Sequence, residues 1–283
     1  MKLKLRLQSK NLCLATALAI TGLLAFPVRA TELKPETTAG FNQYIRATEA
    51  RIAKDMHDGH FLVTDGLPGR ESHEAYAQLR QGRIYVRRLR SEERDKPIRI
   101  PYGLIHHWVG VVFIPGVTLD QTIAELQDYP SQPVKYAPTV RQAKILEHAG
   151  NEFKTFRQFY YKQIVTVVIN AEFDDVYETL NASQATVRSS STRLAEVADS
   201  DKPTAHELPV GNDHGYIWRL QNYWHIEEKD AGVYAQVESV TLTRTVPLAF
   251  AWLVNPLIKS IPRAVISGTL SQTRKAILTR KTP

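Results

Sequence analysis

Residues 232–279 read GVYAQVESVTLTRTVPLAFAWLVNPLIKSIPRAVISGTLSQTRKAILT and contain the two periodic patterns that decide the fold. From Gly232 to Val246 two rows of residues alternate: one row is mostly small, as at Val233 and Ala235, and the other includes Gln236 and Glu238. This period of two is typical of a β-strand. After Pro247 the spacing becomes helical, and one apolar stripe continues to about Thr279. The stripe consists of Leu253, Leu257, Ile261, Val265, Ile266, Leu270 and Ile277. We therefore predict a long strand followed by a long C-terminal helix.

The chain before this segment predicts a sheet. Residues 103–116 are dense in β-branched and aromatic side chains and end at Pro115-Gly116, as expected for a strand. Thr118 and Gln121 then have the spacing of a capping box, which predicts a helix to about Asp128. Further strands are predicted near residues 140–147, 152–161, 163–173, 185–197 and 215–227. The short connections between them indicate antiparallel neighbours.

The predicted order from Gly103 is strand, helix, six strands and a long helix. One helix cannot cover seven strands by lying flat, so the sheet must curl around it to bury both apolar surfaces. Such a bent sheet leaves an elongated gap beside the helix, and gaps of this kind commonly hold apolar ligands.

Two segments resemble a known family. One runs from Asp128-Tyr129-Pro130 to Ile145-Leu146; the other comprises residues 215–220 and 232–234 followed by Pro247 and the terminal helix. They are similar to the START-like or SRPBCC superfamily, near the polyketide cyclases and the coenzyme-Q-binding START-type proteins. The resemblance implies an α+β helix-grip fold, a curved antiparallel sheet of about seven strands wrapped around a long C-terminal helix. Neither segment is catalytic, so the resemblance specifies the fold but says little about the chemistry.

The first thirty residues have the organisation of a signal peptide. A basic segment with Lys2, Lys4, Arg6 and Lys10 precedes the apolar run 12–26, and Val28-Arg29-Ala30 fits a signal-peptidase site. We predict cleavage after Ala30 and a periplasmic or secreted protein. An uncleaved membrane anchor is the alternative, because the apolar run approaches the length of short spanning helices.

Residues 31–102 are predicted to be an N-terminal extension of the START-like domain, which would occupy residues 103–283. The extension should contain one amphipathic helix from Pro35 to about Met56, with Thr37 or Thr38 as the cap at its start. Residues 75–79 and 83–89, joined by Gln81-Gly82, are interpreted as a hairpin. The extension has no counterpart in the family resemblance, and its role stays open.

Charge and cysteine content exclude several classes of function. The formal net charge is +7, but the predicted signal peptide holds five of the 36 basic residues and no acid, which leaves 31 bases and 29 acids. A net charge near +2 does not indicate the strongly basic surface that is typical of nucleic-acid-binding proteins. The charged run 87–96 is interpreted as solvated, and its alternative, a transient contact with a membrane surface, stays open. Cys13 is the single cysteine and lies in the signal peptide, so disulfides and thiol chemistry are not expected in the mature chain.

No catalytic residue, metal site or cofactor is predicted. His106 and His107 are adjacent on a strand and point to opposite faces, so they cannot bind one ion together. His57 and His60 have metal-ligand spacing, but Gly59 between them argues against a continuous helix. Phosphate-binding loops and common hydrolase motifs are absent from the sequence.

The predicted ligand site combines one strand with the terminal helix. Alternation places Tyr216, Trp218, Leu220, Asn222 and Trp224 on one strand face, which is either ordinary core or a cavity wall. The predicted ligand-binding residues are Tyr216, Trp218, Asn222, Trp224, Leu253, Leu257 and Ile261.

The neighbouring strand and three further side chains leave alternatives open. The neighbouring strand offers mostly small residues from Val233 to Thr241, whereas its other parity would turn Gln236 and Glu238 inward. The sequence leaves open which way Arg157, Arg244 and His106 face.

These patterns support three hypotheses. The leading one is an exported, non-catalytic binding protein or carrier for a hydrophobic small molecule such as a lipid, isoprenoid or quinone. The second is an enzyme of the cyclase or dehydratase type that uses the same cavity. The third is a structural envelope protein with a filled core. The oligomeric state is not predicted.

Overall fold

The computed structural model describes residues 31–283 except 94–95, 163–165, 246–247 and 281–283, and omits the side chains of residues 31 and 248–261. Residues 31–283 form one compact unit. The predicted signal peptide lies outside the described residues. Among the described residues, no helix is long and apolar enough to cross a membrane.

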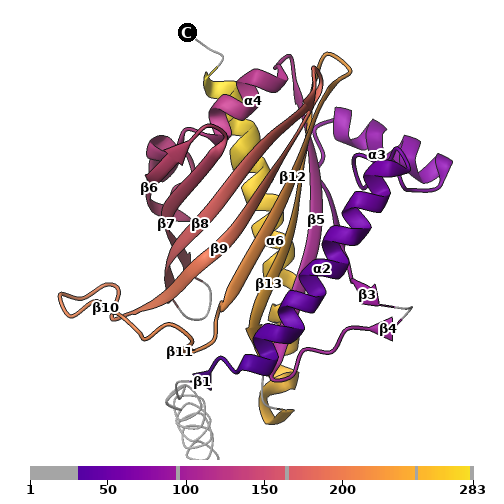
Figure 1. Ribbon diagram of the computed structural model, residues 1–283. Helices are drawn as coiled ribbons and strands as arrows, with labels where there is room; N and C mark the ends of the chain where they lie inside the picture. Colours follow the sequence, from indigo (N-terminus) through magenta and orange to yellow (C-terminus); the bar gives the residue numbers. More distant parts are fainter. Residues whose placement is uncertain (1–30, 94–95, 163–165, 246–247, 281–283) are drawn as a thin grey trace, which may run out of the picture. The chain divides into compact units, whose positions relative to one another are not determined.

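A large antiparallel sheet forms the centre of this unit (Figure 1), with the strand order β2-β5-β13-β12-β9-β8-β7-β6. Its strands are β2 (Tyr85–Arg88), β5 (Gly103–Pro115), β6 (Val140–Ala149), β7 (Glu152–Lys162), β8 (Thr166–Asn181), β9 (Gln184–Ala198), β12 (Arg219–Lys229) and β13 (Gly232–Arg244). The short β10 (His206–Glu207) pairs with β9. Two small sheets pair β1 (Thr31–Glu32) with β11 (Asn212–Asp213), and β3 (Glu92–Glu93) with β4 (Lys96–Pro97). The seven predicted strands are confirmed, and β2 extends the sheet by one strand beyond β5.

Helices lie on both faces of this sheet. They are α2 (Pro35–His57), α3 (Gly69–Arg80), α4 (Leu119–Leu126), the 3-10 helix η1 (Tyr129–Ser131), α5 (Gln132–Lys135) and α6 (Leu248–Arg280). In Figure 1 the sheet separates α2 in front from α6 behind. We call the face toward α6 the inner face and the face toward α2 the outer face. The α+β class and the long C-terminal helix within a curved sheet are as predicted.

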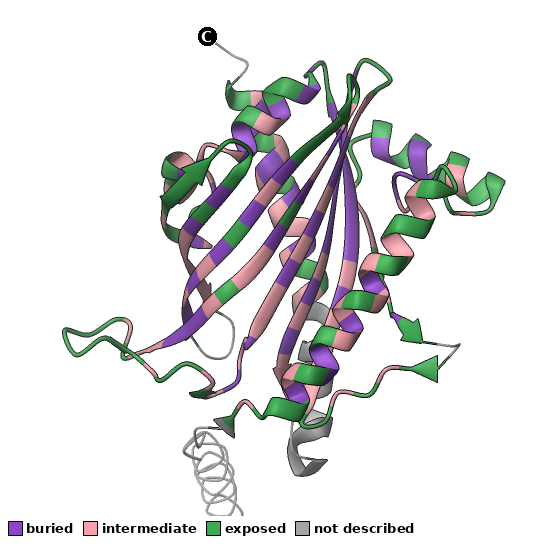
Figure 2. Ribbon diagram, in the orientation of Figure 1, coloured by how far each residue is buried: buried purple, intermediate pink, exposed green. Residues whose placement is uncertain are grey.

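Strand alternation divides β13 between the two faces. Val233, Ala235 and Val237 belong to the same core cluster as Ile266 and Leu270 of α6. The intervening residues face outward, and the alternate rows of buried positions are visible along the strands in Figure 2. The predicted inward set of small residues is therefore the one that faces α6.

A glycine allows α6 to approach the sheet closely. A Cβ added to Gly110 of β5 would lie 2.5 Å from Ile266 Cγ2 and 2.7 Å from Leu270 Cδ1. Such distances are shorter than van der Waals contact, so only glycine fits at this position without displacing the helix.

Helix α2 packs on the outer face through aromatic residues. Phe41 and Tyr44 form a buried cluster with Trp218, Val240 and Leu242. These side chains are at most 5 % exposed. The predicted amphipathic helix is confirmed, and the sheet provides the surface that buries its apolar stripe.

Three local predictions differ from the structure. Residues 69–80 form α3 and not half of a hairpin, because Ala75, Tyr76 and Leu79 are buried together on one helical face. Gly82 follows α3 with φ of 83°, a conformation that favours glycine after a helix. The threonine cap predicted for α2 is also wrong, since Lys34 occupies the N-cap and Thr37 Oγ1 donates to Pro101 O.

The third difference concerns β12, which begins at Arg219 and not at residue 215. Gly215 has φ of 71° and the chain bends at Trp218. The alternation expected from residue 215 onward is therefore broken before the strand starts.

We expect Gly110→Ala to destabilise the protein by about 1–3 kcal/mol, because the added methyl group would overlap Ile266 and Leu270. Gly268→Ala is the matched control on α6: its Cβ would meet no atom within 4 Å, and alanine should stabilise the helix by up to about 1 kcal/mol. Denaturant unfolding measures both changes. A neutral Gly110→Ala would contradict the close approach of α6.

Candidate functional site

The inner face between β7, β8 and β9 has an apolar wall. Ile169, Ala171, Phe173 and Leu194 are at most 4 % exposed and form one cluster. Side chains from neighbouring segments pack against it while staying partly exposed, namely Phe159, Val167, Ile217 and Leu220. The wall is therefore continuous from β7 to the start of β12.

A buried ion pair interrupts this apolar wall. Arg157 of β7 donates through Nη2 to Asp175 Oδ2 of β8, and Thr155 Oγ1 donates to the same oxygen over 2.6 Å. The Asp175 side chain is 2 % exposed and that of Arg157 is 13 % exposed. Burial opposes the charge of Arg157, but Asp175 keeps the pKa of the guanidinium above its usual value. The pair is thus a neutral polar centre inside an apolar surface.

Tyrosine hydroxyls surround the ion pair. Tyr129 OH lies 2.8 Å from Tyr177 OH, and Tyr136 OH lies 3.2 Å from Thr273 Oγ1 of α6. Burial raises the pKa of Tyr136 to about 12, so the hydroxyl stays protonated and can donate. The Arg157 guanidinium lies over the Tyr129 ring at 5.0 Å, within the range of a cation–π contact. The polar centre therefore extends from the sheet to α6.

Among the described residues, two groups of this centre have no hydrogen-bond partner. Arg157 Nε and Ser189 Oγ of β9 are buried and unpaired. An unpaired buried donor costs free energy, so native proteins usually satisfy such groups with protein, water or ligand. A ligand with an acceptor oxygen would satisfy the Arg157 donor.

Two further inner-face side chains lie deep in the protein and keep accessible surface. Tyr161 of β7 is only partly covered, yet burial raises its pKa to about 12. His106 of β5 is also partly covered, and burial, assisted by Arg88, lowers its pKa to about 4. Both side chains are therefore poorly solvated although neither is fully covered.

Arg157 and His106, whose facing was open, both point to the inner face. His106 Nε2 lies 3.1 Å from Thr243 Oγ1, whereas His107 lies on the outer face, with Nε2 2.7 Å from Glu238 Oε1. The predicted divergence of the two histidines is confirmed. The aliphatic part of Arg244 packs against Gly215, whose added Cβ would lie 2.7 Å from Arg244 Cβ.

The structure separates the four predicted strand residues of the site. Trp224 is half-buried against the core cluster that contains Ile266 and Leu270 of α6, as expected for an inner-face residue. Trp218 instead lies in the cluster under α2, and its Nε1 donates to Asp213 Oδ1 over 2.9 Å. The bend at Trp218 turns its side chain away from the face predicted by alternation.

Tyr216 and Asn222 lie apart from each other along the sheet. Tyr216 precedes the strand, its N–H donates to Glu196 Oε1 over 2.7 Å, and its ring lies beside His214. Asn222 is half-buried and pairs in register with Ser189 and Ser239. The helix side of the predicted site, Leu253, Leu257 and Ile261, lies outside the described side chains.

The sequence interpretation missed most of the polar centre. Asp175, Thr155, Tyr129 and Tyr177 were not singled out, and Arg157 was named only as a candidate without a facing. A signal was present, because Phe153, Thr155 and Arg157 share one face by alternation. Their partner on β8 depends on the register of two strands, which sequence does not specify.

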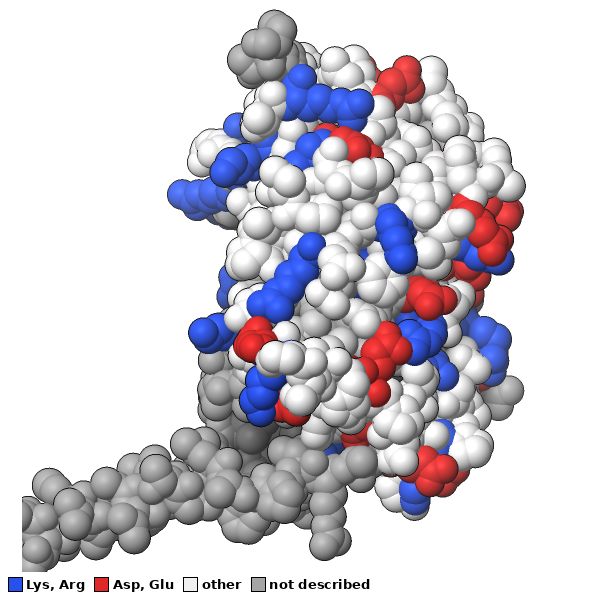
Figure 3. Space-filling model, turned by 90° about the vertical axis from the view of Figure 1, so that its left-hand side faces the viewer, with Lys and Arg blue, Asp and Glu red and all other residues white. Residues whose placement is uncertain are grey.

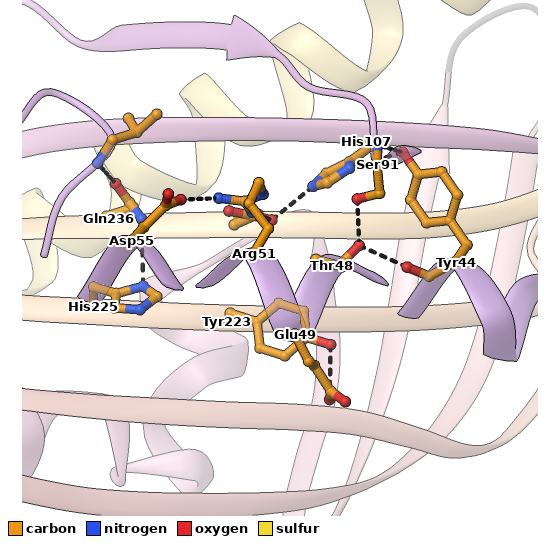
Figure 4. A network of polar contacts seen from close by, with 12 residues as sticks. Tyr44, Thr48, Glu49, Arg51, Asp55, Ser91, His107, Tyr223, His225 and Gln236 are labelled. Atoms are coloured by element: carbon orange, nitrogen blue, oxygen red, sulfur yellow. Dashed lines mark hydrogen bonds and ion pairs between the residues drawn. The ribbon is translucent and has the colours of Figure 1, made fainter. Parts of the chain in front are cut away.

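A second polar cluster joins α2 to the outer face (Figure 4). Glu238 of β13 accepts from Arg51 of α2 and from His107. Tyr44 OH lies 2.9 Å from His107 Nδ1 and accepts from Ser91 N–H over 2.9 Å. Burial alone would raise the pKa of Glu238, but His107 and Arg51 hold it below its usual range. His107 and Glu238 are each 1 % exposed, so the centre of this cluster is closed to solvent, and the cluster binds α2 to the sheet.

The same cluster continues toward the end of α2. His225 Nδ1 accepts from Gln236 Nε2 over 3.3 Å, and Gln236 Oε1 accepts from Val63 N–H over 2.7 Å. Tyr223 OH donates to Glu49 Oε1 over 3.1 Å. Desolvation lowers the pKa of the buried His225 to about 4. Gln236 and Glu238 are the β13 residues that the other parity of the strand would have turned inward. In the structure they face α2 instead.

The described residues contain no group of three or more His, Cys, Asp or Glu side chains that could hold a metal ion.

Comparison with known proteins gives similarity at the level of structure. No family model and no curated protein sequence matches the chain. Among solved structures, a STAR-related lipid transfer protein fragment from Xanthomonas axonopodis is 15% identical, with a TM-score of 0.44 over 67% of this chain and 98% of that chain. Human STARD10 is 11% identical, with a TM-score of 0.43 over 75% of this chain and 80% of that chain. The Zhui aromatase/cyclase from Streptomyces sp. R1128 is 11% identical, with a TM-score of 0.42 over 62% of this chain and 96% of that chain. The START-like proteins that the sequence resembles are thus present among the similar structures.

We expect Asp175→Asn to cost about 3–5 kcal/mol of stability, because it leaves the Arg157 charge buried without a counter-charge. The double variant Arg157→Met/Asp175→Leu should lose much less, since it removes both charges and keeps the volume. Denaturant unfolding of both variants checks this. Equal losses would show that the pair is not coupled.

The low pKa of His225 predicts a loss of stability in acid. Its folded-state pKa of about 4 lies below the unfolded value of 6.5, so the unfolded chain takes up the proton first as the pH falls. The resulting loss develops between pH 6.5 and 4 and reaches about 2–3 kcal/mol near pH 4.5. His225→Gln should remove this share of the pH dependence in unfolding experiments at pH 7 and 4.5. An unchanged pH dependence in the variant would contradict the assignment.

Proposed function

We propose that this protein is an exported, non-catalytic binding protein or carrier for a hydrophobic small molecule of lipid, isoprenoid or quinone type. The observation that carries the proposal is the neutral, incompletely satisfied polar centre beside the apolar wall of the inner face. Pockets for small molecules have this composition, a largely apolar lining with a few placed polar groups. The ligand body would lie between the inner face and α6.

The polar centre also indicates which end of a ligand it would receive. Arg157 is already neutralised by Asp175, and a second charge would be costly in an apolar surrounding. Arg157 Nε and the Ser189 hydroxyl have no hydrogen-bond partner within the described part of the chain. A carbonyl or hydroxyl oxygen satisfies these groups without adding charge, so we favour a ligand with a neutral polar end.

Export is part of the same proposal and depends on residues 1–30. Their basic, apolar and small-residue segments have the order that signal peptidase uses. The compact unit begins at Thr31, directly after the proposed cleavage site. Cleavage there would leave the whole of this unit in the mature protein.

A cyclase or dehydratase type of enzyme is the second candidate, because Glu196 is a buried carboxyl beside a histidine. Burial and the neighbouring Asp213 raise the pKa of Glu196, and its Oε2 lies 2.9 Å from His214 Nδ1. However, Glu196 also accepts the backbone N–H groups of His214 and Tyr216. These hydrogen bonds give Glu196 a structural role, because they hold the turn at residues 214–216. We therefore rank the carrier first.

Native mass spectrometry of the protein from the cell envelope tests both parts of the proposal. The protein mass should correspond to a chain that starts at Thr31, and a small apolar molecule should be released on activation. A retained N-terminus would contradict export. Repeated absence of any bound molecule, together with no binding of an environment-sensitive apolar dye, would favour the structural alternative.

Two tryptophan variants separate a ligand wall from ordinary core. Trp224→Ala should weaken ligand or dye binding at least tenfold with a modest loss of stability, because Trp224 is only half-buried on the inner face. Trp218→Ala should cost about 3–5 kcal/mol and leave ligand retention of the folded protein unchanged, since Trp218 is 2 % exposed under α2. Equal effects of both variants on binding would contradict this division.

A further inference from the structure

The near-neutral charge of residues 31–283 conceals a strong segregation. Residues 239–283 contain seven Lys or Arg and no Asp or Glu, so 24 of the 31 bases and all 29 acids lie in residues 31–238. The acid-free segment comprises the end of β13 and the whole of α6. A charge asymmetry of this kind points to a polyanionic partner for one side of the molecule.

The described half of α6 presents its bases to solvent. Arg263 and Lys275 are exposed, and Arg274 is half-buried. Among the described residues, none of the three forms an ion pair with a carboxylate; Arg274 Nη1 instead donates to Gly82 O over 2.7 Å. A surface cation that is paired with a carboxylate is already neutralised. These three cations are not paired in this way, so they are available to an external partner.

A shallow hollow of about 550 Å³ lies beside the last turns of α6. It is lined by Arg274, Lys275, Leu278 and Thr279. Cations next to an apolar side chain suit the surface of a bilayer, where headgroup charge and acyl chain are adjacent.

The edge strand beside α6 extends this basic region. Ile84 and Val86 pack against the core cluster that contains Ile266 and Ile277 of α6. Arg83 and Arg88, which flank them in sequence, are exposed and form no ion pair within the described part of the chain. Figure 3 views the molecule from the left-hand side of Figure 1, and in it Lys and Arg side chains gather in the upper left part of the surface. Most acidic side chains in that view lie farther right.

We propose that the basic face formed by Arg83, Arg88, Arg263, Arg274 and Lys275 docks the protein on an anionic lipid bilayer. Charge complementarity carries the proposal, since each Lys or Arg near an anionic bilayer strengthens binding about fivefold. The choice of a bilayer over another polyanion rests on the proposed function, because a carrier of apolar molecules must exchange them with a membrane. Docking by this face would place α6 beside the lipid.

Vesicle co-sedimentation of a chain that starts at Thr31 tests the docking face. Vesicles of phosphatidylcholine with one third phosphatidylglycerol should bind the protein, pure phosphatidylcholine should not, and binding should fall as salt rises. Arg263→Gln/Lys275→Gln should weaken binding at least tenfold. Both side chains are exposed and make no hydrogen bond or ion pair with the residues that the structure describes, so the fold should be unaffected.

The matched control removes the same charge on the α2 side. Arg46→Gln/Arg99→Gln replaces two exposed arginines that form no ion pair with any described residue and should bind vesicles like the parent. Equal weakening by both pairs would show a response to net charge alone and overturn the proposal. Duplex DNA that binds as tightly and with the same sensitivity to Arg263→Gln/Lys275→Gln would overturn the assignment to a bilayer. Native mass spectrometry measures ligand retention independently of vesicle binding. A failure of the carrier proposal can therefore be distinguished from a failure of the docking proposal.

Discussion

The alternation of side chains along β5, β13 and β12 is the constraint on which the rest of the structure depends. Each of these strands is covered on both sides, by α6 on the inner face and by α2 or the segment around α3 on the outer face. Every second residue must therefore suit a different partner. On β13 Val233, Ala235 and Val237 of one row are small and apolar, whereas the other row contains the polar Gln236 and Glu238. A shift of one residue would exchange the two rows and bury charges against α6.

The two faces use buried charge differently. On the outer face Glu238 is engaged by both Arg51 and His107, and the cluster links residues from α2, β5 and β13. Buried ion pairs add little net stability but penalise wrong arrangements strongly. The outer cluster therefore selects one position of α2 on the sheet. On the inner face Arg157 and Asp175 come from adjacent strands of the sheet, so this pair attaches no helix to the sheet. That difference is why we assign ligand binding to the inner face and attachment of α2 to the outer one.

The segregation of charge can be read from the sequence, but the net charge of the whole chain hides it. A count over the whole mature chain gives a value close to zero, and that count correctly argues against a nucleic-acid-binding domain. It does not describe the face made by α6 and β2, because the acids lie elsewhere in the chain. The relevant quantity for a docking surface is the charge within about one Debye length of it.

The sequence by itself determined the order of the main strands and helices from β5 to α6, the capping box of α4 and the divergence of His106 and His107. These features depend on backbone periodicity and on contacts a few residues apart, which any stretch of chain carries locally. Tertiary structure decided which helix covers each face of the sheet and where Trp218 points, because a single bend before β12 cancels the alternation. It also decided the pairing of Arg157 with Asp175, since residues 18 positions apart meet only through the register of β7 on β8. Sequence patterns identify the face of a strand, but the partner across that face is a property of the assembled fold.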